Sequence, residues 1–274
     1  MNVVRRYVEA ALFVALWMGL GWIFRLDANS YLILGVPLLV AFQLGVRRLP
    51  LRTLWVREPA SAFLLDGPGL LFAGLLMSVP ALDVMQWTRA HGNWIIGLWL
   101  VCAVAGAVCA AFALRQQRPD AARRALPAFL AAAVIGAALM AAAAAARGNS
   151  VGLPLVKLWP LFHQFLSYFA VSFVLEEVVF RGALDSHVYP STTNESESGA
   201  RWWSAIFVSA LWGIWHLPVI LTKSALELVA VIPIVLTVHT LVGVPLSFAW
   251  RTGGTLVLPA FAHTLIDAYR NVIQ

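Results

Sequence analysis

Long apolar stretches, separated by short polar segments, run through most of the chain. Each is close to the roughly 20 apolar residues that a helix needs to cross a hydrocarbon core. We identify nine: 7–24, 30–46, 68–87, 93–114, 126–146, 160–184, 202–221, 225–248 and 254–272. Two are irregular, because 30–46 is short and contains Pro37, and 225–248 contains Pro233 and Pro245, so the pattern predicts eight or nine spans.

The length and continuity of these stretches also predict the fold class. Unpaired backbone polar groups are not tolerated in lipid, so each span must be a helix or part of a closed barrel, and the stretches are too long and continuous for barrel strands. We therefore expect an all-α protein, a polytopic transmembrane helical bundle. The composition agrees: the 274 residues are 61% hydrophobic and only 12% charged, and the mean hydropathy is +0.81, values typical of membrane proteins.

The basic residues predict an orientation rather than a nucleic-acid partner. The formal net charge is +6, but the Lys and Arg residues lie in short segments between spans and form no single basic face. With nine spans and a cytoplasmic N-terminus, thirteen of the 19 Lys and Arg fall on the inside: Arg5, Arg6, Arg47, Arg48, Arg52, Arg57, Arg115, Arg118, Arg123, Arg124, Arg181, Arg201 and Arg251. We expect a multi-pass protein of the cytoplasmic (inner) membrane, whose partner is the lipid bilayer and whose first span is retained.

The chain divides into two parts that differ in content. Residues 1–150 are poor in polar residues of functional type and rich in small residues, including six consecutive alanines at 141–146. Small residues let transmembrane helices pack closely, so this part is predicted to be scaffold. Residues 158–274 carry the informative polar residues, and the polar stretch at 190–200 is expected to be a solvent loop.

Ionisable residues inside apolar stretches are costly, so each is a functional candidate unless it lies near the end of a span. Glu176 and Glu177 are consecutive in the segment SFVLEEVVFRG. On a helix, Glu177 and Arg181 are four residues apart and can pair, whereas Glu176 is rotated by roughly 140° from Arg181. The pattern predicts a structural ion pair and leaves Glu176 free to act as a general base. The acids near span ends are predicted to be structural or interfacial: Glu9, Asp83 and Glu227.

Two histidines in later spans extend this candidate set. His216 lies in LWGIWHLP, and His263 and Asp267 lie four residues apart in PAFAHTLIDAY. At that spacing the carboxylate can orient the imidazole or share a ligand with it. Three spans that each contribute a buried acid or histidine are expected to meet, because their polar groups then satisfy one another. The other histidines are left unassigned: His91, His163, His187 and His239.

These residues resemble the CPBP family of intramembrane proteases, which includes CAAX prenyl protease 2 and the bacteriocin-processing Abi proteins. The family pattern consists of Glu-Glu-x-x-x-Arg, then Phe-x-x-x-His, then His-x-x-x-Asn or Asp. The resemblance covers about 160–272 and places these motifs on Glu176, Glu177 and Arg181, on Trp212 and His216, and on His263 and Asp267.

Two positions depart from the family pattern. Trp212 replaces the usual Phe, which is a change of one aromatic residue for another. Asp267 stands where eukaryotic-type prenyl-protein proteases have Asn, and an ionised Asp cannot donate a hydrogen bond to an oxyanion as Asn can. Three roles for Asp267 therefore stay open: orienting His263, binding a metal, or acting only when protonated.

The resemblance implies an intramembrane endopeptidase that cleaves a membrane-associated peptide or protein. In the implied mechanism Glu176 and His216 activate water, while His263, positioned by Asp267, stabilises the tetrahedral intermediate. No cofactor is expected. The alternative is a zinc ion held by Glu176, His216 and His263 with one position open for water, but the usual His-Glu-x-x-His motif is absent.

Two other classes of protein compete with this interpretation. A non-catalytic immunity or scaffold protein of the same fold would be expected to lose the glutamates, which are intact here. A proton-coupled transporter would usually show internal repeats, and none is visible. A prenylated substrate is implied by the resemblance alone and is not adopted.

Overall fold

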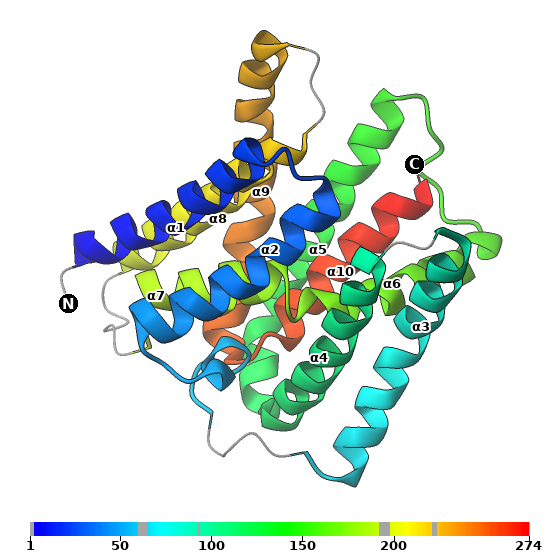
Figure 1. The fold of residues 1–274 in the computed structure, drawn as a ribbon, viewed down its shortest axis with the longest axis horizontal. Helices are drawn as coiled ribbons and strands as arrows, with labels where there is room; N and C mark the ends of the chain where they lie inside the picture. The colour runs from blue at the N-terminus through cyan, green and yellow to red at the C-terminus, as the bar shows by residue number, and fades with distance from the viewer. Residues whose placement is uncertain (1–2, 60–64, 92–93, 192–197, 221–223, 274) are drawn as a thin grey trace.

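The computed structural model describes residues 3–59, 65–91, 94–191, 198–220 and 224–273. Within these residues the chain forms a bundle of ten α-helices (Figure 1), and the only β-structure there is one isolated bridge between Val56 and Thr255. The prediction of an all-α fold is confirmed. The α-helices are α1 (Val3–Ile23), α2 (Ala28–Ala41), α3 (Gly67–His91), α4 (Trp94–Gln116), α5 (Pro119–Ala146), α6 (Leu158–Ser172), α7 (Ser186–Val188), α8 (Ser198–Trp215), α9 (Ala225–Gly253) and α10 (Val257–Ile273).

Five helical stretches in the described part of the chain are long and apolar enough to cross a membrane, so the chain is an integral membrane protein. They are Ala28–Arg47, Gly67–Gln86, Gly97–Gln116, Pro119–Ala146 and Leu226–Gly253. Pro233 and Pro245 do not break the last of these, since α9 is continuous. The expected spans at 7–24, 160–184, 202–221 and 254–272 do not meet the same criterion, and α6 and α10 have only 15 and 17 residues. That these four cross the membrane stays a prediction.

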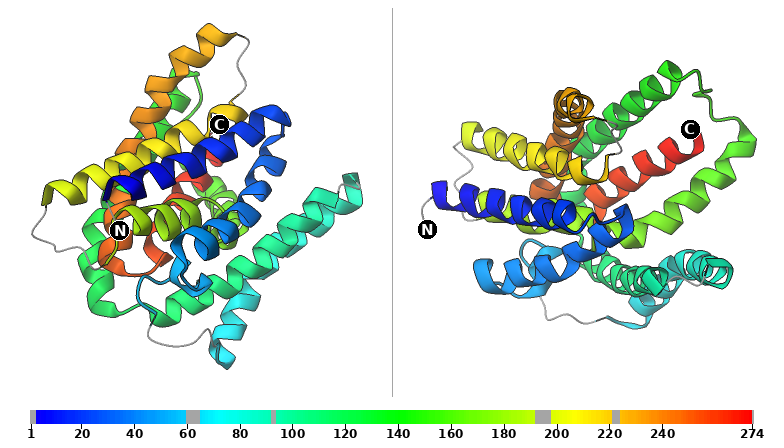
Figure 2. Two further views of the ribbon diagram at one scale, coloured as in Figure 1. Left: turned by 60° about the vertical axis from the view of Figure 1, so that its left-hand side comes forward. Right: turned by 45° about the horizontal axis from the view of Figure 1, so that its top comes forward.

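The helices are arranged around α6 and α10, which pack against each other. On one flank lie α3 and α4, a closely packed pair that also contacts α6. On the other flank α5 packs against both α10 and α9, and α8 packs against α9 (Figure 2). The second half of the chain therefore forms the centre of the bundle. The polar loop expected at 190–200 falls mainly on residues 192–197, which lie outside the described residues.

The single helix expected over 160–184 is interrupted. Helix α6 ends at Ser172, and after a turn of three residues the chain continues through Glu176 into the π-helical segment η4 (Val178–Asp185). The carbonyl of Phe173, in the turn, accepts a hydrogen bond of 2.5 Å from the indole N–H of Trp55. That bond satisfies a backbone group which a helix break in apolar surroundings would otherwise leave unpaired. The break sets the start of η4, and π-helical turns occur frequently at functional sites.

A buried aromatic cluster fixes the end of α8. Trp17 of α1 donates to the carbonyl of Tyr31 in α2 at 2.9 Å, and the Tyr31 hydroxyl donates to the carbonyl of Trp215 at 2.8 Å. The rings of Tyr31 and Trp215 stack with their centroids 5.2 Å apart. Because the side chains of Trp17 and Tyr31 each donate to a backbone carbonyl of another helix, the cluster joins three helices. His216 follows this anchored residue directly.

We predict that the contact between α4 and α6 depends on Gly106. A Cβ atom at this position would overlap the backbone carbonyl of Ala170, which is rigid, so Gly106→Ala forces the helices apart. Overpacking of this kind costs about 1–3 kcal/mol. Thermal unfolding in one detergent should show a lower midpoint for Gly106→Ala than for the wild type. Gly97→Ala, on the same helix with nothing within 4 Å of the added atom, is the matched control and should not lower the midpoint, because Ala favours a helix more than Gly does.

Candidate active site

The predicted site residues form two layers that differ in exposure. Glu176, His216, His263 and Asp267 line a cavity of about 400 Å³ among α2, α4, α5, α6, α8, α9 and α10. The side chains of Glu176 and His216 are 22% and 24% exposed, whereas that of Glu177 is 1% exposed. Glu177 and Arg181 therefore lie behind the cavity wall and cannot meet a ligand directly, although they contact residues that can.

Glu176 and His216 face each other across the cavity. Oε2 of Glu176 accepts a hydrogen bond of 2.9 Å from the indole N–H of Trp212. Nδ1 of His216 donates to the carbonyl of Trp212 at 2.8 Å, an assignment that leaves Nε2 as the acceptor nitrogen. This Nε2 lies 3.7 Å from Oε2 of Glu176. The separation is too long for a direct hydrogen bond, but a water between the two acceptors can bond to both.

Glu177 holds His263 in place. Its Oε1 accepts from Nδ1 of His263 at 2.9 Å, and its Oε2 lies 3.6 Å from Nε of Arg181, so the ion pair expected between Glu177 and Arg181 is present. Nε2 of His263 lies 3.4 Å from Oδ2 of Asp267. The structure thus differs from the sequence expectation in the carboxylate that fixes His263, because the closer contact comes from Glu177. Oδ1 of Asp267 lies 3.1 Å from Nη1 of Arg270.

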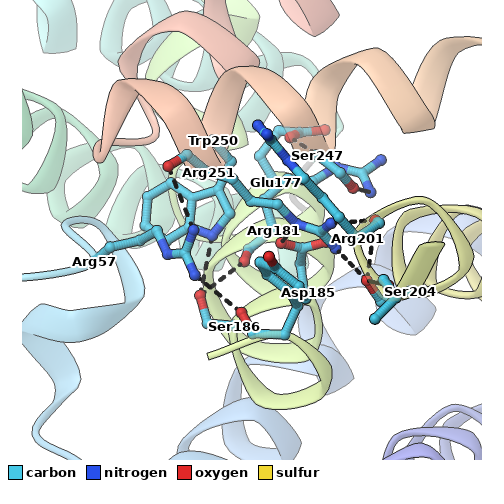
Figure 3. A network of polar contacts seen from close by, with 12 residues as sticks. Arg57, Glu177, Arg181, Asp185, Ser186, Arg201, Ser204, Ser247, Trp250 and Arg251 are labelled. Carbon is cyan, nitrogen blue, oxygen red and sulfur yellow. Dashed lines mark hydrogen bonds and ion pairs between the residues drawn. The ribbon is translucent and has the colours of Figure 1, made fainter. Parts of the chain in front are cut away.

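Arg181 links this site to a buried polar network (Figure 3). It is fully buried, donates to Ser247 Oγ at 3.0 Å, and lies with its guanidinium 5.2 Å from the ring centroid of Trp212. One helical turn further along, Asp185 forms a two-pronged ion pair with Arg251 of α9, with distances of 2.6 and 2.9 Å. Bidentate pairs of this kind fix orientation as well as charge.

Sequence reasoning missed several members of this constellation. Asp185 carried a readable signal, since it continues the four-residue spacing of Glu177 and Arg181, but its partner Arg251 is 66 residues away. His239, left unassigned as a lone histidine, lines the cavity with its ring centroid 4.3 Å from that of His216. A mid-span histidine without a partner at helical spacing gave no local sign of this contact.

The indole ring of Trp212 contacts the imidazole rings of His239 and His263. Its ring centroid lies 4.7 Å from that of His239 and 5.1 Å from that of His263, both in edge-on geometry. In the sequence, Trp212 occupies the aromatic position of the Phe-x-x-x-His motif, where the change from Phe to Trp indicates only an exchange of one aromatic residue for another. The structure shows in addition that the indole N–H reaches Glu176.

The zinc alternative requires Nε2 of His263 and the side chains of Glu176 and His216 to converge on one ion. Glu177 occupies Nδ1 of His263, and a second carboxylate, from Asp267, faces Nε2. Across the described ranges, no group of three or more His, Cys, Asp or Glu side chains is arranged to hold a metal ion. The four cavity-lining residues can instead bind and polarise a water and a carbonyl group.

Comparisons with known proteins agree with the position of these motifs. Residues 158–269 match the family model described as Type II CAAX prenyl endopeptidase Rce1-like. The matched segment begins with α6, ends within α10 and contains all six predicted site residues. No curated protein and no solved structure matches the chain.

The two consecutive glutamates are predicted to differ in their contribution to stability. Glu177→Gln removes the negative charge beside buried Arg181 and His263, and leaving a buried charge uncompensated costs about 3–5 kcal/mol. Glu176→Gln keeps an oxygen that can accept from Trp212 and breaks no ion pair with a guanidinium. Thermal unfolding in detergent should therefore show a clearly lower midpoint for Glu177→Gln alone. Equal midpoints for the two variants would contradict the layered arrangement of the site.

Proposed function

We propose that the protein is an intramembrane endopeptidase in which Glu176 and His216 activate water. The premise is the match of residues 158–269 to the family model of Rce1-like type II CAAX prenyl endopeptidases. The observation that carries the proposal is the pair of acceptors, Glu176 Oε2 and His216 Nε2, placed 3.7 Å apart on the wall of a cavity. A general base must lie within reach of the water that it deprotonates, either directly or through one bridging contact.

The proposed reaction is the addition of water to a peptide carbonyl. Glu176 takes a proton from water while the water oxygen forms a bond to the carbonyl carbon. The carbonyl oxygen becomes an oxyanion, and the product of this step is a tetrahedral intermediate. The proton then passes from Glu176 to the departing amine as the C–N bond breaks, so that peptide and water become a carboxylic acid and an amine. His216 supports this step as the second acceptor for the water, and Trp212 keeps the carboxylate of Glu176 in place through its N–H.

His263 is proposed to stabilise the oxyanion of the intermediate. Nδ1 already donates to Glu177, so a protonated ring has its other N–H at Nε2, beside Asp267 and at the wall of the cavity. Donors fixed before the reaction are worth more in a site that excludes water than in bulk solvent. This assignment gives Glu177 a positioning role, because it acts on the reaction only through His263.

The cavity supports a membrane-associated peptide or protein as the substrate. Apolar side chains contributed by six helices form much of its wall: Leu32, Trp99, Met140, Val171, Val238 and Ile266. An apolar segment of a substrate can bury itself against these residues while its carbonyl reaches Glu176. The family description names CAAX prenyl endopeptidases, and for this chain we propose the wider class of membrane-associated substrates.

Loss of cleavage in Glu176→Gln is the main test of the proposal. General base catalysis contributes about 10²–10⁴-fold, so the variant should cleave a responsive member of a fluorogenic library of membrane-associated peptides at least a hundredfold more slowly than the wild type. Proteoliposomes with equal amounts of folded protein are the assay system. Glu227→Gln, an exposed glutamate at the start of α9, is the matched control and should retain activity. Equal cleavage by wild type and Glu176→Gln would overturn the assignment.

A chelator separates the two mechanistic versions in the same assay. Cleavage that survives chelation but is lost in Glu176→Gln supports the metal-free reaction. Cleavage that is lost on chelation and restored by added zinc would instead support the metal-dependent version.

We predict that Asp267→Asn retains more activity than Asp267→Ala. Asn can still place an amide oxygen beside Nε2 of His263, which lies 3.4 Å from Oδ2 of Asp267, whereas Ala removes this polar neighbour of the imidazole. Loss of a residue that orients a catalytic group costs about 10–100-fold in activity. The measurement is kcat/KM for both variants on one peptide. Equal losses for the two variants would show that the charge of Asp267, and not its acceptor oxygen, is what the reaction needs.

A further inference from the structure

A second cavity, of about 540 Å³, lies away from the active site at another end of the helix bundle. It forms where the C-terminal ends of α4 and α9 meet the N-terminal end of α5. Its charged lining consists of five arginines and one acid: Arg57, Arg118, Arg124, Arg201, Arg251 and Glu58. We call this cavity the arginine pocket. None of its lining residues takes part in the proposed hydrolysis.

The arginine pocket lies at the boundary of the membrane. Three of the five membrane-crossing stretches, Gly97–Gln116, Pro119–Ala146 and Leu226–Gly253, have an end there, and Gln116 and Gly253 line the pocket. The ends of transmembrane helices lie at the depth of the lipid headgroups, just outside the hydrocarbon core. Lipid phosphates are therefore the most concentrated anions at this position.

Two arginines of the pocket have no acidic partner among the residues that the structure describes. Arg57 donates to the carbonyl of Tyr189 at 2.9 Å, and Arg201 donates to Thr252 Oγ1 at 3.3 Å. Both side chains are half-buried, and neither guanidinium lies within 4.0 Å of a described carboxylate. Neutral acceptors do not compensate a buried positive charge fully, so both arginines can gain from a bound anion.

The other arginines add to the positive potential of the pocket. Arg251 is paired with Asp185, while Arg118 and Arg124 share the single carboxylate of Asp120 at 3.2 Å each. Burial lowers the pKa of Arg57 below its ordinary value, with Asp185 opposing that shift and Arg251 adding to it. An anion next to Arg57 would offset this cost of burial.

We propose that the arginine pocket binds the phosphate group of an anionic lipid headgroup. Guanidinium groups present planar pairs of N–H donors that match phosphate oxygens, and basic pockets between transmembrane helices at the interface are suited to anionic headgroups. Figure 3 shows Arg57 and Arg201 on opposite sides of the buried network that contains Arg251 and Asp185, so the headgroup would bind at the edge of the polar core. The surrounding helix ends would hold the lipid chains against the bundle.

The test measures binding of phosphatidylglycerol and of the zwitterionic lipid phosphatidylcholine to the purified chain, by native mass spectrometry and by thermal stabilisation in detergent. Wild type should bind phosphatidylglycerol in preference to phosphatidylcholine. Arg57→Gln/Arg201→Gln should weaken phosphatidylglycerol binding about 30-fold, which corresponds to about 1 kcal/mol for each arginine. Arg118→Gln/Arg124→Gln alters only exposed side chains and should weaken binding in the same direction, which keeps the test decisive if the first variant folds poorly.

Arg147→Gln is the control, since it removes a positive charge from the opposite end of α5 and should leave lipid binding unchanged. Equal binding of the two lipids, or unchanged phosphatidylglycerol binding in both double variants, would overturn the proposal and show that the arginines are neutralised within the chain. Inorganic phosphate is the third arm. If it stabilises the protein as much as phosphatidylglycerol at the same concentration, the ligand is a free phosphate and the lipid assignment is wrong.

Discussion

The need to neutralise charge in an apolar interior shapes the centre of this protein. Ionised groups out of water are tolerated only when they are paired and hydrogen-bonded. In the described structure, Glu177 meets Arg181 and His263, and Asp185 meets Arg251. The helices that carry these residues are therefore held in one register, since moving any of them by a turn would separate buried charges.

Glu176 is the exception within this network. It has no guanidinium partner among the described residues, and its closest contact is the neutral N–H of Trp212. A carboxylate that is fixed in direction but not neutralised keeps its ability to take up a proton. The ion pairs around it therefore have a function for the site: they stabilise the backbone of η4, so that one carboxylate can face the cavity without a compensating cation.

The sequence allowed the class of fold and the composition of the site to be predicted, because both depend on local spacing. Apolar length gives helices, and the four-residue spacing of Glu177 and Arg181 or of His263 and Asp267 gives neighbours on one face. The break after Ser172 was not predictable in the same way. Neither Pro nor Gly stands there, and the hydrogen bond that satisfies its freed carbonyl comes from Trp55, 118 residues earlier. Contacts of this kind, like that of His239 with His216, exist only after the helices have packed.

Trp212 departs from the family pattern, and in the folded chain it makes two contacts that bear on the site. Phenylalanine can supply an aromatic face at this position but cannot donate a hydrogen bond. The indole does both, since its face lies near the guanidinium of Arg181 while its N–H donates to Glu176. One side chain thus connects the neutralised layer of the site to its reactive layer. In this chain the orientation of Glu176 depends on a donor that the usual Phe would not provide.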